Sequence, residues 1–361
     1  MVGQSWYGVV MAGGGGTRLW PSSRPGRPKQ LMTVQGAKSL LTGAVDRAAA
    51  LVGRSAGVVV VTRADQVEPA RGHMPDLGDD QILAEPIGRN TAPCIGLSAT
   101  VLLHRDPEAV IAVLPADHFI ADVEGFVATC RAAMQEAETG GIVTVGIRPD
   151  HPETGYGYIE MGDVVNEARA VHHAVRFVEK PDLETARTYL ASGRYLWNSG
   201  MFFMRADRIL AEIRDHMPDL AQGLDRIAAG LDHGDGAYRE ALAQVYPDLE
   251  PVSIDYGVME KVADMKVIPG QFGWNDVGSW AALEQIHDAD SDGNISVGST
   301  VTLDDHGCIV VSDDERPVAV LGVQDLVVVS SQAGVLVIPK SRVQEVRRIV
   351  AELKAAGKYE P

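Results

Sequence analysis

Short hydrophobic runs alternate with segments of helical periodicity through the first half of the chain. The runs are rich in valine and isoleucine and predict buried strands at 7–12, 57–62, 81–84, 109–114 and 141–147. Hydrophobic residues recur at helical spacing in 39–52, 90–105 and 123–138. This alternation is typical of an α/β domain whose mixed, mainly parallel sheet is covered by helices on both faces. We therefore expect a ligand at the carboxyl ends of the strands.

The second half of the chain has a different pattern. Residues 156–205 carry strand-like segments around a short helix at 183–190, and about three helical segments follow over 206–245. The turn-rich stretch DADSDGN at 288–294 marks a boundary. Five short strands and an amphipathic helix at 341–356 come after it. We expect one domain over 1–287 and a small β-rich domain over 288–361.

Composition narrows the range of partners. The 361 residues include 49 acidic and 32 basic side chains, which gives a net charge of −17. Such a charge argues against nucleic acid or an anionic membrane as a partner. Since the chain also has no apolar stretch of about 18 residues and no basic start typical of a signal peptide, we expect a cytoplasmic protein. Three widely spaced cysteines predict neither a disulfide framework nor a zinc site.

A glycine-rich loop with basic residues follows the first predicted strand. Residues 13–30 read GGGGTRLWPSSRPGRPKQ, with Arg18, Arg24, Arg27 and Lys29 after the glycines. Consecutive glycines let backbone N–H groups approach an anion, although they also suit a flexible turn. The chain has neither the GxxxxGK string of a P-loop nor the dinucleotide-binding fingerprint. The added basic residues favour a triphosphate ligand.

The loop closely resembles the signature of the sugar-nucleotide pyrophosphorylases, in the form typical of mannose-1-phosphate guanylyltransferases. Gly15 stands where relatives often carry another small residue. Further matches follow in the family's order and cover most of the chain: EPIGRNTAPCI at 85–95, LPADHFI at 114–120, FVEKP at 177–181, WNSGMF at 197–202, SIDYGVMEK at 253–261 and GWNDVGSW at 273–280. The resemblance implies a Rossmann-like nucleotidyltransferase domain and a C-terminal domain like a left-handed β-helix, which commonly supports homodimers. Some members of the family carry an additional phosphomannose isomerase domain, but we expect none here, since only about 70 residues follow the boundary.

Two aspartates are the metal-ligand candidates. Asp117 follows a predicted strand and Asp276 lies in a Gly- and Trp-rich turn, so each alone also suits a cap or turn position. Magnesium prefers one or two carboxylates together with phosphate oxygens and water. The resemblance identifies both as ligands of Mg²⁺. It implies that mannose 1-phosphate attacks the α-phosphorus of GTP, giving GDP-mannose and pyrophosphate, with Arg18 and Lys29 stabilising the phosphate charge.

Other residues are assigned to the two substrates. By resemblance, the loop residues Gly13, Gly14, Gly16 and Thr17 bind the nucleotide, and the sugar phosphate is bound by Tyr156, Gly157, Glu179, Lys180, Asn198 and Ser199. Glu85 suits guanine because one carboxylate can accept from both N1–H and N2–H. For Asn90 two roles stay open, a helix cap and a contact with the ribose or base of the nucleotide. Asp255 is a reserve metal or sugar ligand.

Two other functions stay open. The same chemistry could act on another pair, such as glucose 1-phosphate with UTP or dTTP. The chain could also be a regulator that binds a nucleotide sugar without catalysis. The joint presence of Arg18, Lys29, Asp117 and Asp276 speaks against the regulator.

Overall fold

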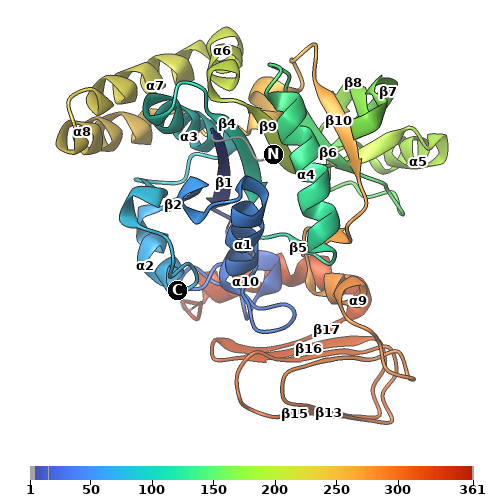
Figure 1. Ribbon diagram of the computed structural model, residues 1–361. Coiled ribbons are helices and arrows are strands. Elements are labelled where there is room, and N and C mark those ends of the chain that lie inside the picture. The colour runs from blue at the N-terminus through green and yellow to red at the C-terminus, as the bar shows by residue number, and fades with distance from the viewer. Residues whose placement is uncertain (1–4, 15, 360–361) are drawn as a thin grey trace.

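A nine-stranded sheet forms the centre of the larger part of the molecule. The computed structural model describes residues 5–14 and 16–359, and Gly15 therefore lies outside the described residues. The strand order is β3-β2-β1-β4-β9-β6-β10-β8-β7 (Figure 1). The four strands of the first half are β1 (Trp6–Ala12), β2 (Val58–Arg63), β3 (Ile82–Glu85) and β4 (Val110–Pro115). All of their mutual pairings are parallel, as the sequence predicts.

The second half of the sheet corrects the expectation of mainly parallel pairing. It contains β6 (Val143–Ile147), β7 (Tyr158–Asn166), β8 (Val171–Val178), β9 (Tyr195–Arg205) and β10 (Lys266–Gly270). β10 runs parallel to β6, whereas β9 is antiparallel to β4, β6 and β7, and β8 is antiparallel to β7 and β10. The turn at Glu167–Arg169 joins β7 directly to β8, and such a short connection allows only an antiparallel pair. The sheet is therefore mixed.

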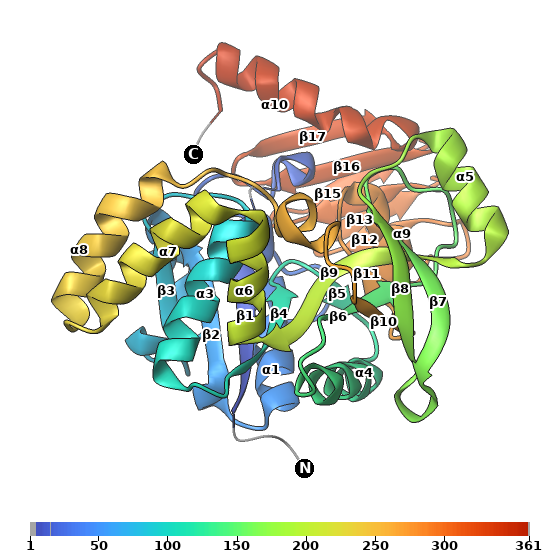
Figure 2. The ribbon, with the colours of Figure 1, turned by 90° about the horizontal axis from the view of Figure 1, so that it is seen from above.

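Helices cover both faces of this sheet. One face packs on α1 (Leu40–Val52) and α4 (Val123–Ala137), and the other on α3 (Thr91–Arg105), α6 (Ala206–His216) and α7 (Pro218–Leu231) (Figure 2). Strand alternation decides which face each side chain joins. Val10 of β1 belongs to the α1 side and Val9 to the α3 side, and both are fully buried. The larger part of the molecule also contains α2 (Val67–Arg71), α5 (Leu183–Ser192), α8 (Asp235–Val245) and α9 (Leu283–Ile286).

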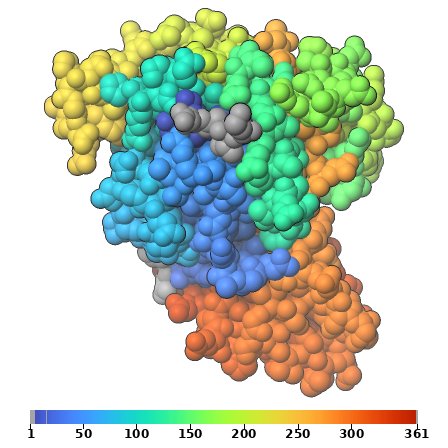
Figure 3. Space-filling model, in the orientation of Figure 1, coloured from blue at the N-terminus to red at the C-terminus, as the bar shows by residue number. Residues whose placement is uncertain are grey.

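The C-terminal part forms a separate lobe (Figure 3), and the lobe is built of short β-strands. Its strands are β12 (Ile295–Val297), β13 (Thr300–Leu303), β14 (Ile309–Ser312), β15 (Val318–Leu321), β16 (Leu326–Ser331) and β17 (Gly334–Pro339). β12, β14 and β16 pair in parallel, as do β13 and β15, so alternate strands stack as successive turns of one coil. β17 folds back antiparallel on β16, and helix α10 (Val346–Ala355) follows.

Two short strands, β5 (Phe119–Ile120) and β11 (Trp274–Asn275), pair outside the nine-stranded sheet.

The segment after the glycine loop is buried between the two parts. Leu19, Trp20 and Met32 share a hydrophobic core with the C-terminal strands and with α10. Trp280 Nε1 donates to the Trp20 carbonyl at 3.1 Å, and Arg27 forms an ion pair with Asp313. The basic residues after the loop therefore do not form one phosphate patch, because Arg27 is bound to the C-terminal part instead. Among the described residues, no helix combines the length and hydropathy that crossing a membrane requires.

Candidate active site

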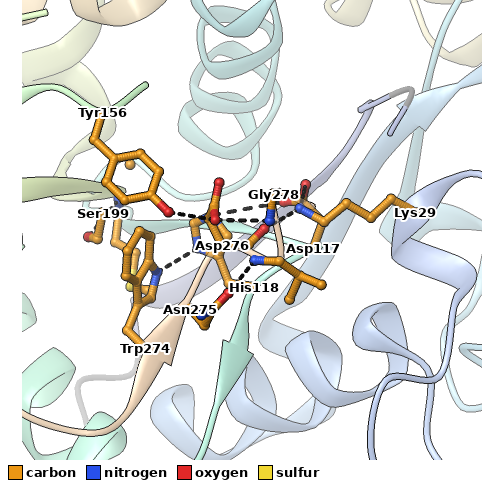
Figure 4. Close-up of polar contacts among 12 residues, drawn as sticks. Lys29, Asp117, His118, Tyr156, Ser199, Trp274, Asn275, Asp276 and Gly278 are labelled. Carbon is orange, nitrogen blue, oxygen red and sulfur yellow. Dashed lines mark hydrogen bonds and ion pairs between the residues drawn. The ribbon is translucent and has the colours of Figure 1, made fainter. Parts of the chain in front are cut away.

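Lys29 joins the two predicted metal-binding aspartates. Its side chain is buried, and Nζ lies 2.8 Å from Asp117 Oδ2. The same Nζ donates to the main-chain carbonyl of Asp276 (Figure 4). These contacts span 88 and 247 positions of the sequence. The fold thus brings three of the four predicted catalytic residues to one point at the carboxyl end of β4.

Asp117 is held as a carboxylate. Burial alone would raise the pKa of this carboxyl, but the neighbouring Lys29 ammonium and its hydrogen bond lower the pKa below the ordinary value. At neutral pH the pair is therefore a negative group facing a positive one. The Asp117 carboxylate can therefore bind a metal cation of the ligand, and the Lys29 ammonium can bind a phosphate.

Asp276 has its carboxylate fixed by two donors. Tyr156 Oη donates to Oδ1 at 2.6 Å, and the Gly278 N–H donates to the same oxygen at 3.0 Å. Burial and the adjacent carboxylate raise the pKa of the Tyr156 hydroxyl, so it remains a donor. Tyr156, expected at the sugar, therefore also orients a metal-ligand candidate.

Two residues beside the aspartates were missed by the sequence analysis. Trp274 Nε1 donates to His118 Nδ1 at 3.1 Å, and their rings meet edge to face. Burial lowers the pKa of His118 to about 4, so the ring is neutral and can accept this bond. The only signal was adjacency: each residue lies next to, or two positions from, a predicted aspartate. The contact ties β5 to β11 and fixes the spacing of Asp117 and Asp276.

The glycine loop passes between Glu85 and Asp117. A Cβ built on Gly13 would lie 4.0 Å from Glu85 Oε2, and one on Gly14 would lie 3.7 Å from Asp117 Oδ2. Gly16 has a φ of +55°, and its Cβ would come within 2.5 Å of Lys29 Cβ, so this position requires glycine. Thr17 begins a short 3₁₀ helix after Gly16. Exposed glycines between two carboxylate positions leave backbone N–H groups accessible to an anion.

Arg18 lies apart from the lysine–aspartate centre. It stands on the same short helix as Thr17, and its Nη1 donates to Gln344 Oε1 of the C-terminal part at 3.3 Å. Arg18, Tyr156, Lys180 and Asp276 nevertheless line one cavity of about 860 Å³. Arg18 therefore faces the same open space as the centre without touching it.

Glu85 is buried at the end of β3, with 3% of its surface exposed. Tyr246 Oη donates to Glu85 Oε1 in a short hydrogen bond across 161 positions. Burial raises the pKa of Glu85, and the Tyr246 hydroxyl opposes that rise. The sequence analysis did not identify Tyr246, because nothing local links it to Glu85. Asn90, by contrast, is exposed and caps α3, with Oδ1 accepting from Thr91 N at 2.8 Å.

The residues predicted for the sugar phosphate meet around a second cavity of about 190 Å³. Glu179 and Asn198 flank Gly157, whose Cβ would lie 2.5 Å from Glu179 Oε2. Asn198 Nδ2 donates to Asp255 Oδ1 at 2.9 Å, which places the reserve candidate in this pocket. Burial, followed by the charge of Glu179, raises the pKa of Asp255 to about 6.

Lys180 and Ser199 are held differently. Lys180 is exposed and forms an ion pair with Glu179. Ser199 also lines the second cavity, but it is buried and its hydroxyl donates to the Val145 carbonyl at 2.6 Å. Its hydroxyl is therefore engaged with the sheet.

Few carboxylates gather at this centre. Within the described ranges, no group of three or more histidine, cysteine, aspartate or glutamate side chains has the arrangement of a metal site. The two aspartates contribute the available carboxylates. This number suits a cation that takes most of its ligands from substrate phosphates and water.

Comparisons with known proteins identify the family of the chain. The family model described as nucleotidyl transferase matches residues 7–293, and one described as MannoseP isomerase/GMP-like beta-helix domain matches residues 298–353. A mannose-1-phosphate guanylyltransferase of Escherichia coli K12 is 38% identical, over 98% of this chain and 74% of its own length. The xanthan biosynthesis protein XanB of Xanthomonas campestris is 40% identical over the same shares.

A solved structure extends the likeness to three dimensions. It comes from Thermus thermophilus and is described as mannose-1-phosphate geranyltransferase. Its TM-score is 0.88 at 38% identity, over 97% of this chain and all of the other. The chain therefore belongs to the nucleotidyl transferase family, in the group of the mannose-1-phosphate guanylyltransferases.

Proposed function

We propose that this protein transfers GMP from GTP to α-D-mannose 1-phosphate, forming GDP-mannose and pyrophosphate. The observation that carries the proposal is the buried Lys29 Nζ, which joins Asp117 and the Asp276 segment at the sheet edge. Relatives named mannose-1-phosphate guanylyltransferase match nearly the whole chain, which supports the choice of substrates.

Asp117 and Asp276 are the proposed ligands of Mg²⁺. Their two carboxylates, with no third acidic ligand in the described residues, fit an ion that completes its shell with phosphate oxygens and water. When bound, the ion would neutralise phosphate charge. Tyr156 and the Gly278 N–H hold one Asp276 oxygen in place, which leaves Oδ2 for the cation.

The reaction is a displacement at phosphorus. A phosphate oxygen of mannose 1-phosphate forms a new bond to the α-phosphorus of GTP, and the bond from that phosphorus to the α,β-bridging oxygen breaks. Pyrophosphate leaves with the bonding electrons. Two anions must meet, so the protein's part is positioning and charge neutralisation. Lys29 and Arg18 are the proposed cations for the phosphates.

The nucleotide is proposed to lie along the glycine loop. Gly13, Gly14, Gly16 and Thr17 would offer backbone N–H groups to the triphosphate, with Glu85 at one end of the loop to read guanine. Glu85 Oε1 is engaged by Tyr246, and Oε2 faces Gly13. Asn90 already caps α3, so any contact it makes with the ribose would be additional.

The sugar phosphate is proposed to occupy the pocket of Glu179, Asn198 and Gly157. Lys180 would bind its phosphate and Glu179 its hydroxyls. Gly157 leaves room for the ring, because any side chain there would meet Glu179. Ser199 would act through the shape of the pocket wall, since its hydroxyl is bound to Val145.

We also propose the finer architecture implied by the family. The chain would divide into 1–287 and 288–361, the C-terminal coil would be left-handed, and this lobe would support a homodimer. The ends of the two matched segments, at 293 and 298, support a boundary close to the turn-rich stretch.

A substrate panel tests the function. The purified chain is incubated with Mg²⁺, each of GTP, ATP, UTP and dTTP, and each of mannose 1-phosphate and glucose 1-phosphate, while pyrophosphate release is followed. We expect the highest rate with GTP and mannose 1-phosphate. A faster rate with another pair would replace the substrates. Binding of GDP-mannose without pyrophosphate release from any pair would favour a noncatalytic regulator.

A further inference from the structure

The large cavity beside Asp276 has a wall from the C-terminal lobe. Of the residues that line its 860 Å³, Gln344 comes from the short 3₁₀ helix Lys340–Glu345 and Arg347 from α10. Arg18, Tyr156 and Asp276 come from the larger part of the molecule. Gln344 accepts from Arg18 at 3.3 Å. Both residues line the cavity, so Arg347 faces the same space as Gln344 and Arg18. Figure 1 shows α10 where the C-terminal lobe meets the larger part.

The acidic side chains of this cavity already have partners. Asp276 accepts from Tyr156, Glu284 pairs with Lys340 at 2.8 Å, and Glu153 accepts from the Gly155 N–H at 2.7 Å. Arg18 and Arg347, by contrast, have no ion pair within the described part of the chain. The cavity therefore keeps two guanidinium groups available for an external anion.

The other arginines near α10 are arranged differently. Arg342 and Arg348 both bind Glu345, at 2.7 and 2.5 Å, and neither lines the cavity. Glu345 thus neutralises Arg342 and Arg348, whereas Arg347, which lines the cavity, forms no ion pair with any described residue. Guanidinium groups bind phosphate oxygens in paired hydrogen bonds, which suits this arrangement.

We propose that Arg347 is a substrate-binding residue for the terminal phosphates of the nucleotide, acting beside Arg18, so that the C-terminal lobe completes the active site. This rests on the proposed function. Arg18 comes directly after the glycine loop in the sequence. Its position favours the β- and γ-phosphates of GTP, which leave as pyrophosphate, as the ligand of the two arginines rather than the sugar phosphate. Lys180, the residue proposed for the sugar phosphate, lines the same cavity.

Matched variants test the inference in both directions of the reaction. Arg347→Ala is compared with Arg348→Ala and Arg347→Lys. For Arg347→Ala we expect the KM for GTP, and for pyrophosphate in the reverse reaction, to rise about tenfold, as loss of one charge-assisted contact implies. The KM for mannose 1-phosphate should stay within about twofold, Arg347→Lys should fall in between, and Arg348→Ala should behave as the wild type.

Direct binding separates this inference from the proposed function. Calorimetry with magnesium pyrophosphate should show about tenfold weaker binding to Arg347→Ala than to Arg348→Ala, at equal melting temperatures. Equal pyrophosphate affinities for the two variants, or an increase confined to the KM for mannose 1-phosphate, would overturn the role of Arg347. A wild-type protein that makes no GDP-mannose would instead overturn the function, while calorimetry would still test the arginine.

Discussion

The pKa of a buried carboxyl is shifted in opposite directions at the two ends of the site, at Asp117 beside the proposed phosphates and at Asp255 beside the proposed sugar. Asp117 lies against the Lys29 ammonium, which lowers its pKa despite burial. The side-chain donor to Asp255 is the neutral amide of Asn198, and burial together with Glu179 raises the pKa of Asp255 to about 6. One end is therefore charged in advance for a cation and phosphates, whereas the other presents acceptors suited to neutral hydroxyl groups.

Glu85 is an intermediate case. It is as deeply buried as Lys29, but its donor is a neutral tyrosine hydroxyl. Burial raises its pKa and Tyr246 limits the rise. The three carboxylates thus rank by partner: a cation at Asp117, a hydroxyl at Glu85, and an amide beside a like charge at Asp255. The partner of each carboxylate, more than its burial, decides what each part of the site can bind.

Removal of the lysine should have the largest effect. Lys29→Ala should lower kcat at least about a hundredfold, because a preorganised charge at the developing phosphates is lost. Lys29→Gln, which keeps a hydrogen-bond donor without the charge, should lose nearly as much. Steady-state kinetics measure this, with Lys38→Ala as control, since Lys38 is exposed and pairs with an exposed Asp46. Near-normal turnover of a folded Lys29→Gln would show that the charge is not needed.

Loss of the Tyr246 hydroxyl should have a smaller effect, and this effect should be confined to nucleotide binding. Tyr246→Phe should raise the KM for GTP about fivefold, the cost of roughly one hydrogen bond, and reduce the preference for GTP over ITP. The pKa of Glu85 should rise further in this variant, so its KM should worsen as pH falls. Tyr238→Phe, another partly buried tyrosine in the same region, is the control. Unchanged nucleotide preference in Tyr246→Phe would remove Tyr246 from base recognition.

The smallest effect should be that of Asp255→Asn on the free energy of unfolding. The pKa of Asp255 is higher in the folded chain than its ordinary value of 3.8, so the free energy of unfolding falls as the pH rises from there to about 6. The stability of Asp255→Asn relative to the wild type should therefore be about 1 kcal/mol greater at pH 7.5 than at pH 5, a modest figure because Asp255 is only half-buried. Urea unfolding at both pH values measures this. An equal difference between the two proteins at both pH values would contradict it.

Local sequence patterns predicted the elements well but not their partners. The five early strands and three helices lie within two residues of the expected ranges, because hydrophobic periodicity is local. The polarity of β9 depends on which strands it joins, and periodicity does not encode that. The contact of Tyr246 with Glu85 and that of Gln344 with Arg18 span 161 and 326 positions, so only the fold reveals them. Asp276 was identified as a metal-ligand candidate through the family resemblance, because its local turn sequence is equally typical of a cap or turn residue.

The most direct test is ³¹P NMR of GTP and mannose 1-phosphate with the wild type, Asp117→Asn and Asp276→Asn in Mg²⁺. We expect GDP-mannose and pyrophosphate to appear in equal amounts with the wild type, and at least about a hundredfold more slowly with either folded variant. Wild-type rates from both variants would contradict an active site built on this aspartate pair.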